Sequence, residues 1–261
     1  MSRLRGVLAQ TWPRLAIIAV IVVVWAALFA TGLWDKIVLP SPISVWDAFW
    51  AHVGGPNGLL ALAGRSLLRL FACLAVSIVV GTGIGLAMAA SKVVQRSVGS
   101  LMVGLQALPS ISWLPLAILW FGPTVKAILF VVVVGAVPAI AVATASSVRL
   151  VPPTLVRTGR TLGARGLELY TKVVLPAAVP GYTAGLQQAW AIAWRALMAA
   201  ELFVTGARGL GHFIVQAGEE FETPLVLATM IVIMLCGIAV DFLFTIVDRR
   251  VRRRRGLLVR S

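Results

Sequence analysis

The chain has 261 residues, of which 60% are hydrophobic and only 12% are charged, and its formal net charge is +14. Because charged residues make up about 25% of a typical soluble domain, this composition excludes an ordinary soluble protein and indicates a membrane protein. Nucleic-acid binding is also excluded, because many of the cations stand in the tail DRRVRRRRG, directly after an apolar run. That is the usual place for cytoplasmic charge beside a membrane helix.

Apolar runs of about the length of a bilayer crossing recur along the chain, and each is interpreted as a membrane helix. The first run follows three arginines. A cleavable signal peptide would need a shorter apolar core and a small-residue cleavage site, so a retained span is favoured. A proline- and glycine-rich loop with a short surface helix comes next, before five more apolar runs. The six expected spans are 15–34, 67–90, 98–121, 125–147, 178–204 and 225–247.

Lysine and arginine positions orient these spans, because cytoplasmic loops are enriched in both residues. With the N-terminus in the cytoplasm, seventeen of these cations fall on the cytoplasmic side and five fall outside or at a boundary. The sequence therefore predicts an all-α membrane protein with six transmembrane helices and both termini cytoplasmic. We expect an N-terminal part with the first span and an external loop (1–61), a core of five spans (62–248) and a basic cytoplasmic tail (249–261).

A charged segment, GRTLGARGLELYTKVVLP, separates the fourth and fifth spans. Apolar residues that include Leu162 and Leu169 recur at helical spacing, which predicts an amphipathic cytoplasmic helix over about 155–172. Gly163 and Ala164 lie off this stripe and leave the backbone nearly bare. Such a helix can lie on anionic lipid or dock closely into another protein, and its composition does not decide between the two.

This segment resembles the cytoplasmic loop of ABC-importer permeases, in which Glu-Ala-Ala is followed by three residues, Gly, nine residues and Ile-any-Leu-Pro. Gly163 and the later Leu175-Pro176 pair match that spacing, and Pro176 either ends the helix or starts the next one. The Glu-Ala-Ala positions hold Arg157, Thr158 and Gly159, so the family acid is replaced by a base. The stretches LPSPISVWDAF, LQALPSISWLPLAILWFGPTVKAILF and AWRALMAAELF are similar to the aliphatic sulfonate, taurine and nitrate permease branch.

The resemblance implies the type I ABC importer permease fold and a non-enzymatic subunit that forms the translocation pathway for a small anionic solute. It further implies a second permease copy, two cytoplasmic ATPase subunits that bind ATP and magnesium, an external binding protein, and a place in the inner membrane of a bacterium. The chain itself should hold no cofactor or metal, and its sequence contains no G-x-x-x-x-G-K-[ST] phosphate loop. The residues expected to couple it to the ATPase are Arg157, Arg160, Gly163, Ala164, Leu175 and Pro176.

Candidate pathway residues come from two features of the spans. Ionisable groups inside a membrane are costly and usually face a cavity, which singles out Arg195 and Glu201. Arg195 is expected to attract an anion or, as the alternative, to pair with an acid or snorkel toward the cytoplasm. A structural role between helices is the alternative for Glu201. Pro109, Ser110 and Trp113 interrupt the third span and either line a path or form a simple kink. The glycines of GTGIGLAMAA are expected to pack helices together.

Two other functional classes stay open at this level. A stand-alone secondary transporter or channel would need ion-coupling acids at mid-span. An integral membrane enzyme would need clustered acids, histidines or a nucleophile at one membrane face, and the sequence contains no such cluster. A neighbouring ATPase gene, or co-purification with an ATPase, would discriminate between these classes and an ABC importer.

Overall fold

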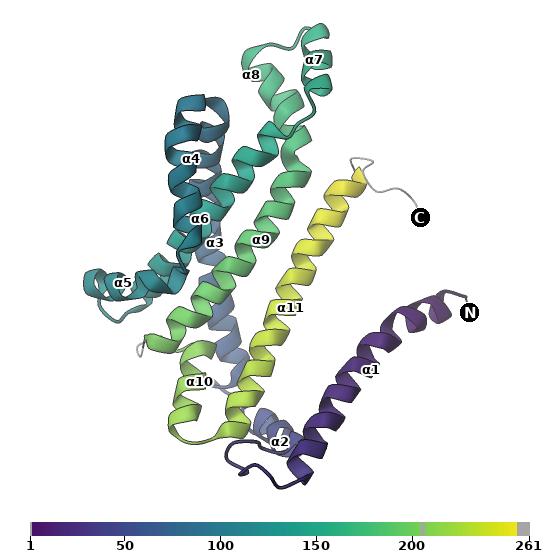
Figure 1. Cartoon of the computed structure of the whole chain (residues 1–261), viewed down its shortest axis with the longest axis vertical. Helices are drawn as coiled ribbons and strands as arrows, with labels where there is room; N and C mark the ends of the chain where they lie inside the picture. The colour runs from purple at the N-terminus through teal and green to yellow at the C-terminus, as the bar shows by residue number, and fades with distance from the viewer. Residues whose placement is uncertain (1, 205–206, 255–261) are drawn as a thin grey trace. The chain divides into compact units, whose positions relative to one another are not determined.

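The computed structural model describes residues 2–204 and 207–254, and Figure 1 shows their course. Helices are the only regular elements in these two ranges, which confirms the expected all-α class. In chain order they are α1 (Ser2–Ala30), α2 (Pro42–His52), α3 (Leu59–Ala90), α4 (Lys92–Ala107), η1 (Ser110–Trp113), α5 (Leu114–Phe121), α6 (Val125–Arg149), α7 (Pro153–Thr161), α8 (Gly166–Leu169), η2 (Tyr170–Val174), α9 (Leu175–Phe203), α10 (Leu210–Glu219) and α11 (Thr223–Arg254).

The chain divides into two compact units. One consists of Met1–Leu62 and Phe213–Val232, and it holds α1, α2 and the first turns of α11. The other consists of Ala63–His212 and Ile233–Ser261, and it holds α4 to α9 with most of α3. The candidate pathway and coupling residues all belong to this second unit.

Fewer helices qualify as membrane spans than the sequence predicts. Three are long and apolar enough to cross a bilayer, Leu59–Ala90, Val125–Arg149 and Thr223–Arg253, and a bent pair could supply a fourth. The first expected span appears only as a shorter apolar helix over Ala16–Ala30 within the described residues. The fifth, α9, is long enough, but its two glutamines, Arg195 and Glu201 lower its hydropathy.

The bent pair lies where prolines were expected to interrupt the third span. α4 ends at Ala107, and Leu108 and Pro109 are extended. A single turn, η1, then leads into α5, and the two helical pieces differ in direction by 98°. This is a broken helix and not a simple proline kink, because two consecutive residues leave the helical conformation.

The single helix expected over 155–172 is wrong. α7 stops at Thr161, and Gly163 has a φ of +92°, a left-handed conformation that favours glycine. The amide of Gly163 donates to the carbonyl of Arg160, and the amide of Ala164 donates to that of Gly159. These two bonds form a Schellman cap, which ends a helix by satisfying its last carbonyls. Pro176 lies in the first turn of α9 and so starts that helix.

Helices α6 and α9 pack side by side at the centre of the second unit (Figure 1). Gly181 and Gly185 make this possible, because a Cβ on either would collide with Ser147 or Ala143 of α6. Small residues four apart let membrane helices approach closely. Gly81 and Gly85 of α3 do the same against α6, whereas a Cβ on Gly83 would meet nothing within 4 Å. The packing role expected for the GTGIGLAMAA glycines therefore applies to two of the three.

Candidate functional site

Four of the five expected pathway residues come together in one pocket of about 350 Å³. Pro109, Ser110 and Trp113 reach it from the break between α4 and α5, and Arg195 reaches it from α9. The break is therefore folded against α6 and α9. Gly135 of α6 makes room for it, because a Cβ there would collide with the Ser110 hydroxyl.

Among the residues that the structure describes, Arg195 is the only charged one that lines this pocket. Its side chain is exposed to the cavity side, and it belongs to none of the three ion pairs found among the described residues. The first alternative for this arginine, pairing with an acid of the same chain, is therefore not realised in the described part. A guanidinium with five donors and no protein anion can bind a carboxylate, sulfonate or nitrate group.

A second pocket of about 440 Å³ extends between α6 and α9 toward the segment after α6. Its lining residues are all uncharged, and most are small, including Ala143, Gly181 and Gly185. The side chain of Gln106 lines both pockets. Its amide donates to the backbone carbonyl of Pro138 over 3.0 Å, which fixes the glutamine at their junction. Sequence reasoning missed Gln106, since a polar residue near the end of an apolar run carries no distinctive signal.

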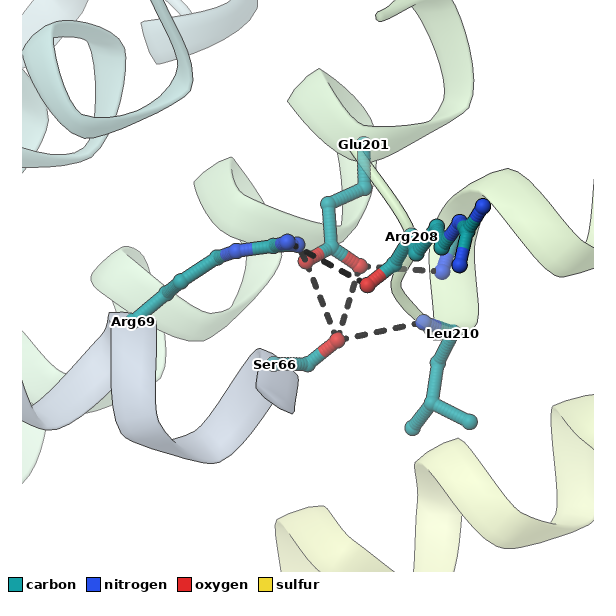
Figure 2. Close-up of polar contacts among 6 residues, drawn as sticks. Ser66, Arg69, Glu201, Arg208 and Leu210 are labelled. Atoms are coloured by element: carbon teal, nitrogen blue, oxygen red, sulfur yellow. Dashed lines mark hydrogen bonds and ion pairs between the residues drawn. The ribbon is translucent and has the colours of Figure 1, made fainter. Parts of the chain in front are cut away.

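Glu201 lines neither pocket and is fully buried. Figure 2 shows its carboxylate surrounded by donors from α3 and from the start of α10. The Ser66 hydroxyl donates to it over 2.9 Å, Arg69 over 2.8 Å and the amide of Gly211 over 3.1 Å. This is the structural role between helices that was the alternative for this residue.

The neighbours of Glu201 extend the same network. Arg69 also donates to the carbonyl of Arg208, and Ser66 accepts from the amide of Leu210 (Figure 2). A buried charge is tolerated when it is paired and hydrogen-bonded. The cluster therefore fastens the end of α9 and the following turn to α3. These contacts join residues more than 130 positions apart, so no local sequence pattern could indicate them.

The coupling residues lie in a compact turn between the end of α6 and the start of α9 (Figure 1). Gly159 is buried against Leu169 and Val173, where a Cβ would be too close, so α7 is held against η2. Leu162 and Leu169 were expected to lie together on the apolar stripe of one helix. Leu169 is buried, but Leu162 is 82% exposed, because the Schellman cap turns it outward.

The segment that contains this exposed leucine also carries polar and charged groups. Arg157 and Arg160 are exposed on α7, and Ala164 is half-buried in the turn. Lys172 donates to Glu168 over 2.7 Å, and this hydrogen bond lowers the pKa of the Glu168 carboxyl from its usual value. The segment thus presents a mixed apolar and basic surface. Leu175 and Pro176 join it directly to α9, the helix that carries Arg195.

Comparison with known proteins finds similarity to membrane components of ABC transporters. Residues 79–253 match the family described as binding-protein-dependent transport system inner membrane component. The chain is 29% identical over 231 residues to a putative ABC transporter permease protein of Methanocaldococcus jannaschii, covering 87% of this chain and 86% of that one. It is 27% identical to the taurine transport system permease protein TauC of Escherichia coli, over 92% of this chain and 88% of that protein.

Two further likenesses agree with these. The nitrate import permease protein NrtB of Leptolyngbya laminosa is 28% identical over 84% of this chain and 75% of its own length. Among solved structures, an inward-facing MetNI methionine ABC transporter superposes with a TM-score of 0.65, at 21% identity, over 74% of this chain and 95% of that one.

Proposed function

Because the chain belongs to the family of binding-protein-dependent transport system inner membrane components, we propose that it is the permease subunit of an ATP-driven importer for a small anionic solute. Sulfonates, taurine and nitrate are the solute class that we infer, and similarity to a taurine and a nitrate permease supports this choice. The permease itself catalyses no reaction.

The observation that carries the anionic solute is Arg195. A cation at the centre of a membrane helix costs about 2.5–3.5 kcal/mol on insertion scales, so an unpaired one is retained for a function. In the pocket it shares with Ser110 and Trp113, a bound anion would restore the missing counter-charge. An anion held there would pass Gln106 into the uncharged second pocket, where nothing holds it by charge and release is favoured.

The cytoplasmic turn is the second part of the proposal. We propose that Leu162 and Ala164 fit a cleft on an ATPase subunit, and that Arg157 and Arg160 meet acidic groups around it. Their exposure supports this role. Gly163 provides the tight turn, and Leu175-Pro176 passes movement of the turn into α9.

Assembly and topology complete the proposal. Two copies of the chain would associate with two ATPase subunits, which bind ATP and magnesium, and with an external binding protein. We propose six spans in the inner membrane with both termini cytoplasmic. They are α3, α6 and α11, the bent pair of α4 and α5, and two helices that do not qualify by length and hydropathy, α1 and α9. The lengths of the apolar runs and the lysine and arginine positions support this topology. Residues 255–261 of the basic tail lie outside the described residues.

Uptake by reconstituted transporter tests the role of Arg195. The permease, its ATPase and its binding protein are placed in liposomes, and uptake of labelled taurine and nitrate is measured for wild type, Arg195→Lys and Arg195→Ala. Loss of a charge-assisted hydrogen bond costs about 1.5–3 kcal/mol, so Arg195→Ala should lower uptake by about 10- to 150-fold. Arg195→Lys keeps the charge and should retain much of it.

The controls separate two failures. ATPase co-purification and basal ATP hydrolysis should be unchanged in both variants. Arg195 lies nineteen residues after Pro176 on α9, about 28 Å along the helix from the turn proposed to contact the ATPase. Normal uptake by Arg195→Ala would show that this arginine binds no solute. Failure of the wild-type chain to co-purify with any ATPase would instead refute the importer itself and favour a stand-alone transporter.

A further inference from the structure

The short helix α2 has an apolar face that no part of the protein covers in the described residues. Ile43, Trp46 and Trp50 are 72%, 61% and 56% exposed. At 3.6 residues per turn they fall within an arc of about 60°. Trp46 and Trp50 stack edge to face with their ring centroids 5.6 Å apart, so the face is an ordered aromatic surface.

The other two sides of α2 differ from this face. Val45 is buried and Phe49 is half-buried on the side that packs against the protein. Asp47 and Ala51 are exposed on the third side, next to one another on the helix. The helix thus has a side against the protein, an exposed aromatic side, and an exposed side that carries its one acidic residue, Asp47.

Hydrogen bonds place α2 at one end of three apolar helices. Trp25 of α1 donates from Nε1 to the carbonyl of Pro40 over 3.0 Å, just before α2 begins. The amide of Leu60, in the first turn of α3, donates to the carbonyl of Val53 just after α2 ends. Thr223, the first residue of α11, donates from its hydroxyl to the carbonyl of Ile37.

These contacts place α2 beside the first residues of two candidate membrane spans. α3 and α11 are two of the helices that qualify as membrane spans, and both begin beside α2. The end of α1 and the segment after it expose further large apolar side chains next to α2, namely Leu33, Trp34, Ile37 and Val38. α2 therefore lies where membrane spans emerge, and tryptophan is enriched at that level because its ring is apolar and its N–H polar.

We propose that α2 is an interfacial anchor, with Ile43, Trp46 and Trp50 inserted among lipid headgroups and upper acyl chains and Asp47 facing water. Lipid fits better than a protein partner because α1, which is bonded through Trp25 to the residue pair before α2, also exposes a long run of large apolar side chains, as does the segment between them. α2 carries no lysine or arginine, so insertion of aromatic rings, and not attraction to anionic lipid, holds it. Ser41 caps the helix and Pro42 starts it, so α2 keeps its shape at the interface.

Spin-label accessibility on the full chain in phosphatidylcholine–phosphatidylglycerol liposomes tests this proposal. In a background with Cys73→Ala and Cys236→Ala, single nitroxides are attached after Trp46→Cys, Trp50→Cys, Asp47→Cys or Ala51→Cys. Molecular oxygen concentrates in the bilayer, whereas a nickel chelate stays in water. Labels at positions 46 and 50 should have an oxygen-to-nickel accessibility ratio several-fold above those at 47 and 51, which are matched controls on the same helix.

Three results would overturn the proposal. Equally low ratios at all four positions would place the whole helix in water, equally high ratios would place Asp47 in the bilayer as well, and low accessibility to both reagents at 46 and 50 would mean that a protein, such as a second copy, covers the face. Quenching of intrinsic fluorescence by brominated lipid gives a second measurement that needs no label. The quenched fraction should fall in Trp46→Phe/Trp50→Phe relative to wild type, and an unchanged fraction would also reject lipid contact.

Discussion

The buried Glu201 cluster gives the sharpest stability prediction. Glu201 is fully buried and bonded to Arg69, whose side chain is 16% exposed. Removing one partner of such a pair leaves the other charge without compensation and costs about 3–5 kcal/mol. Glu201→Leu and Arg69→Met should therefore each destabilise the protein by about that amount. At about 2–4 °C per kcal/mol for a chain of this size, we expect a fall in Tm of about 6–20 °C, measured by thermal unfolding in detergent.

The double variant separates this reasoning from a simple packing effect. Replacing a buried ion pair by apolar residues of similar volume is often neutral, so Arg69→Met/Glu201→Leu should be no less stable than either single variant. Glu201→Gln keeps the shape and should lose only about 1.5–3 kcal/mol, the value of a charged hydrogen bond. Additive losses in the double variant, or single losses below about 1 kcal/mol, would refute the account of a coupled pair.

Two further predictions concern glycine and alanine positions. Ala164→Trp should prevent ATPase pull-down and uptake while leaving the chain folded and inserted. Gly163→Ala adds almost no bulk but strains the φ of +92°, so it is the control, and equal uncoupling by both variants would mean that the cap and not the surface matters. Gly185→Val should lower stability by about 1–3 kcal/mol, because its side chain collides with Ala143. Gly83→Val meets nothing within 4 Å and should be tolerated, and equal melting points would contradict the close α6–α9 contact.

Local patterns predicted the helical class and the interruption of the third span. The length of an apolar run indicates a membrane helix, and a proline disrupts a helix at its own position. They also singled out Arg195, since an arginine inside an apolar run is rare and costly. The coupling segment shows where local patterns mislead. Its apolar stripe favoured one long helix, but the left-handed Gly163 ends α7. The hydrogen bonds of that cap offset the loss of further helical turns, and the stripe could not show this.

Long-range contacts decided the remaining differences. Glu201 and Arg195 are both ionisable groups in α9 only six positions apart, so both were predicted as candidate pathway residues. Their surroundings differ because α3 supplies Ser66 and Arg69 to one of them, whereas the other lines a pocket. Which residue of a pair meets a distant helix depends on the packing of the whole unit. The position of Gln106, which lines both pockets, also depends on this packing, so the sequence alone could not predict it.

The two ends of α9 suggest how movement would reach the pockets. The Glu201 cluster fastens one end to α3, while the other end continues from the cytoplasmic turn. At 1.5 Å per residue, Arg195 lies about 9 Å from the fastened end and Gly185 about 24 Å from it. If α9 tilts as a rigid helix about Glu201, displacement grows with this distance, so the pocket around Gly185 changes more than twice as much as the Arg195 pocket.

In the proposed importer, this arrangement would let an ATPase subunit open the pocket around Gly185 while the pocket around Arg195 keeps its shape. It requires Glu201 to matter for coupling as well as for stability. At a temperature where Glu201→Gln is fully folded, that variant should therefore transport less solute per ATP hydrolysed than wild type. An unchanged ratio, together with the lower melting point, would mean that the cluster only stabilises the fold and that α9 does not turn about it.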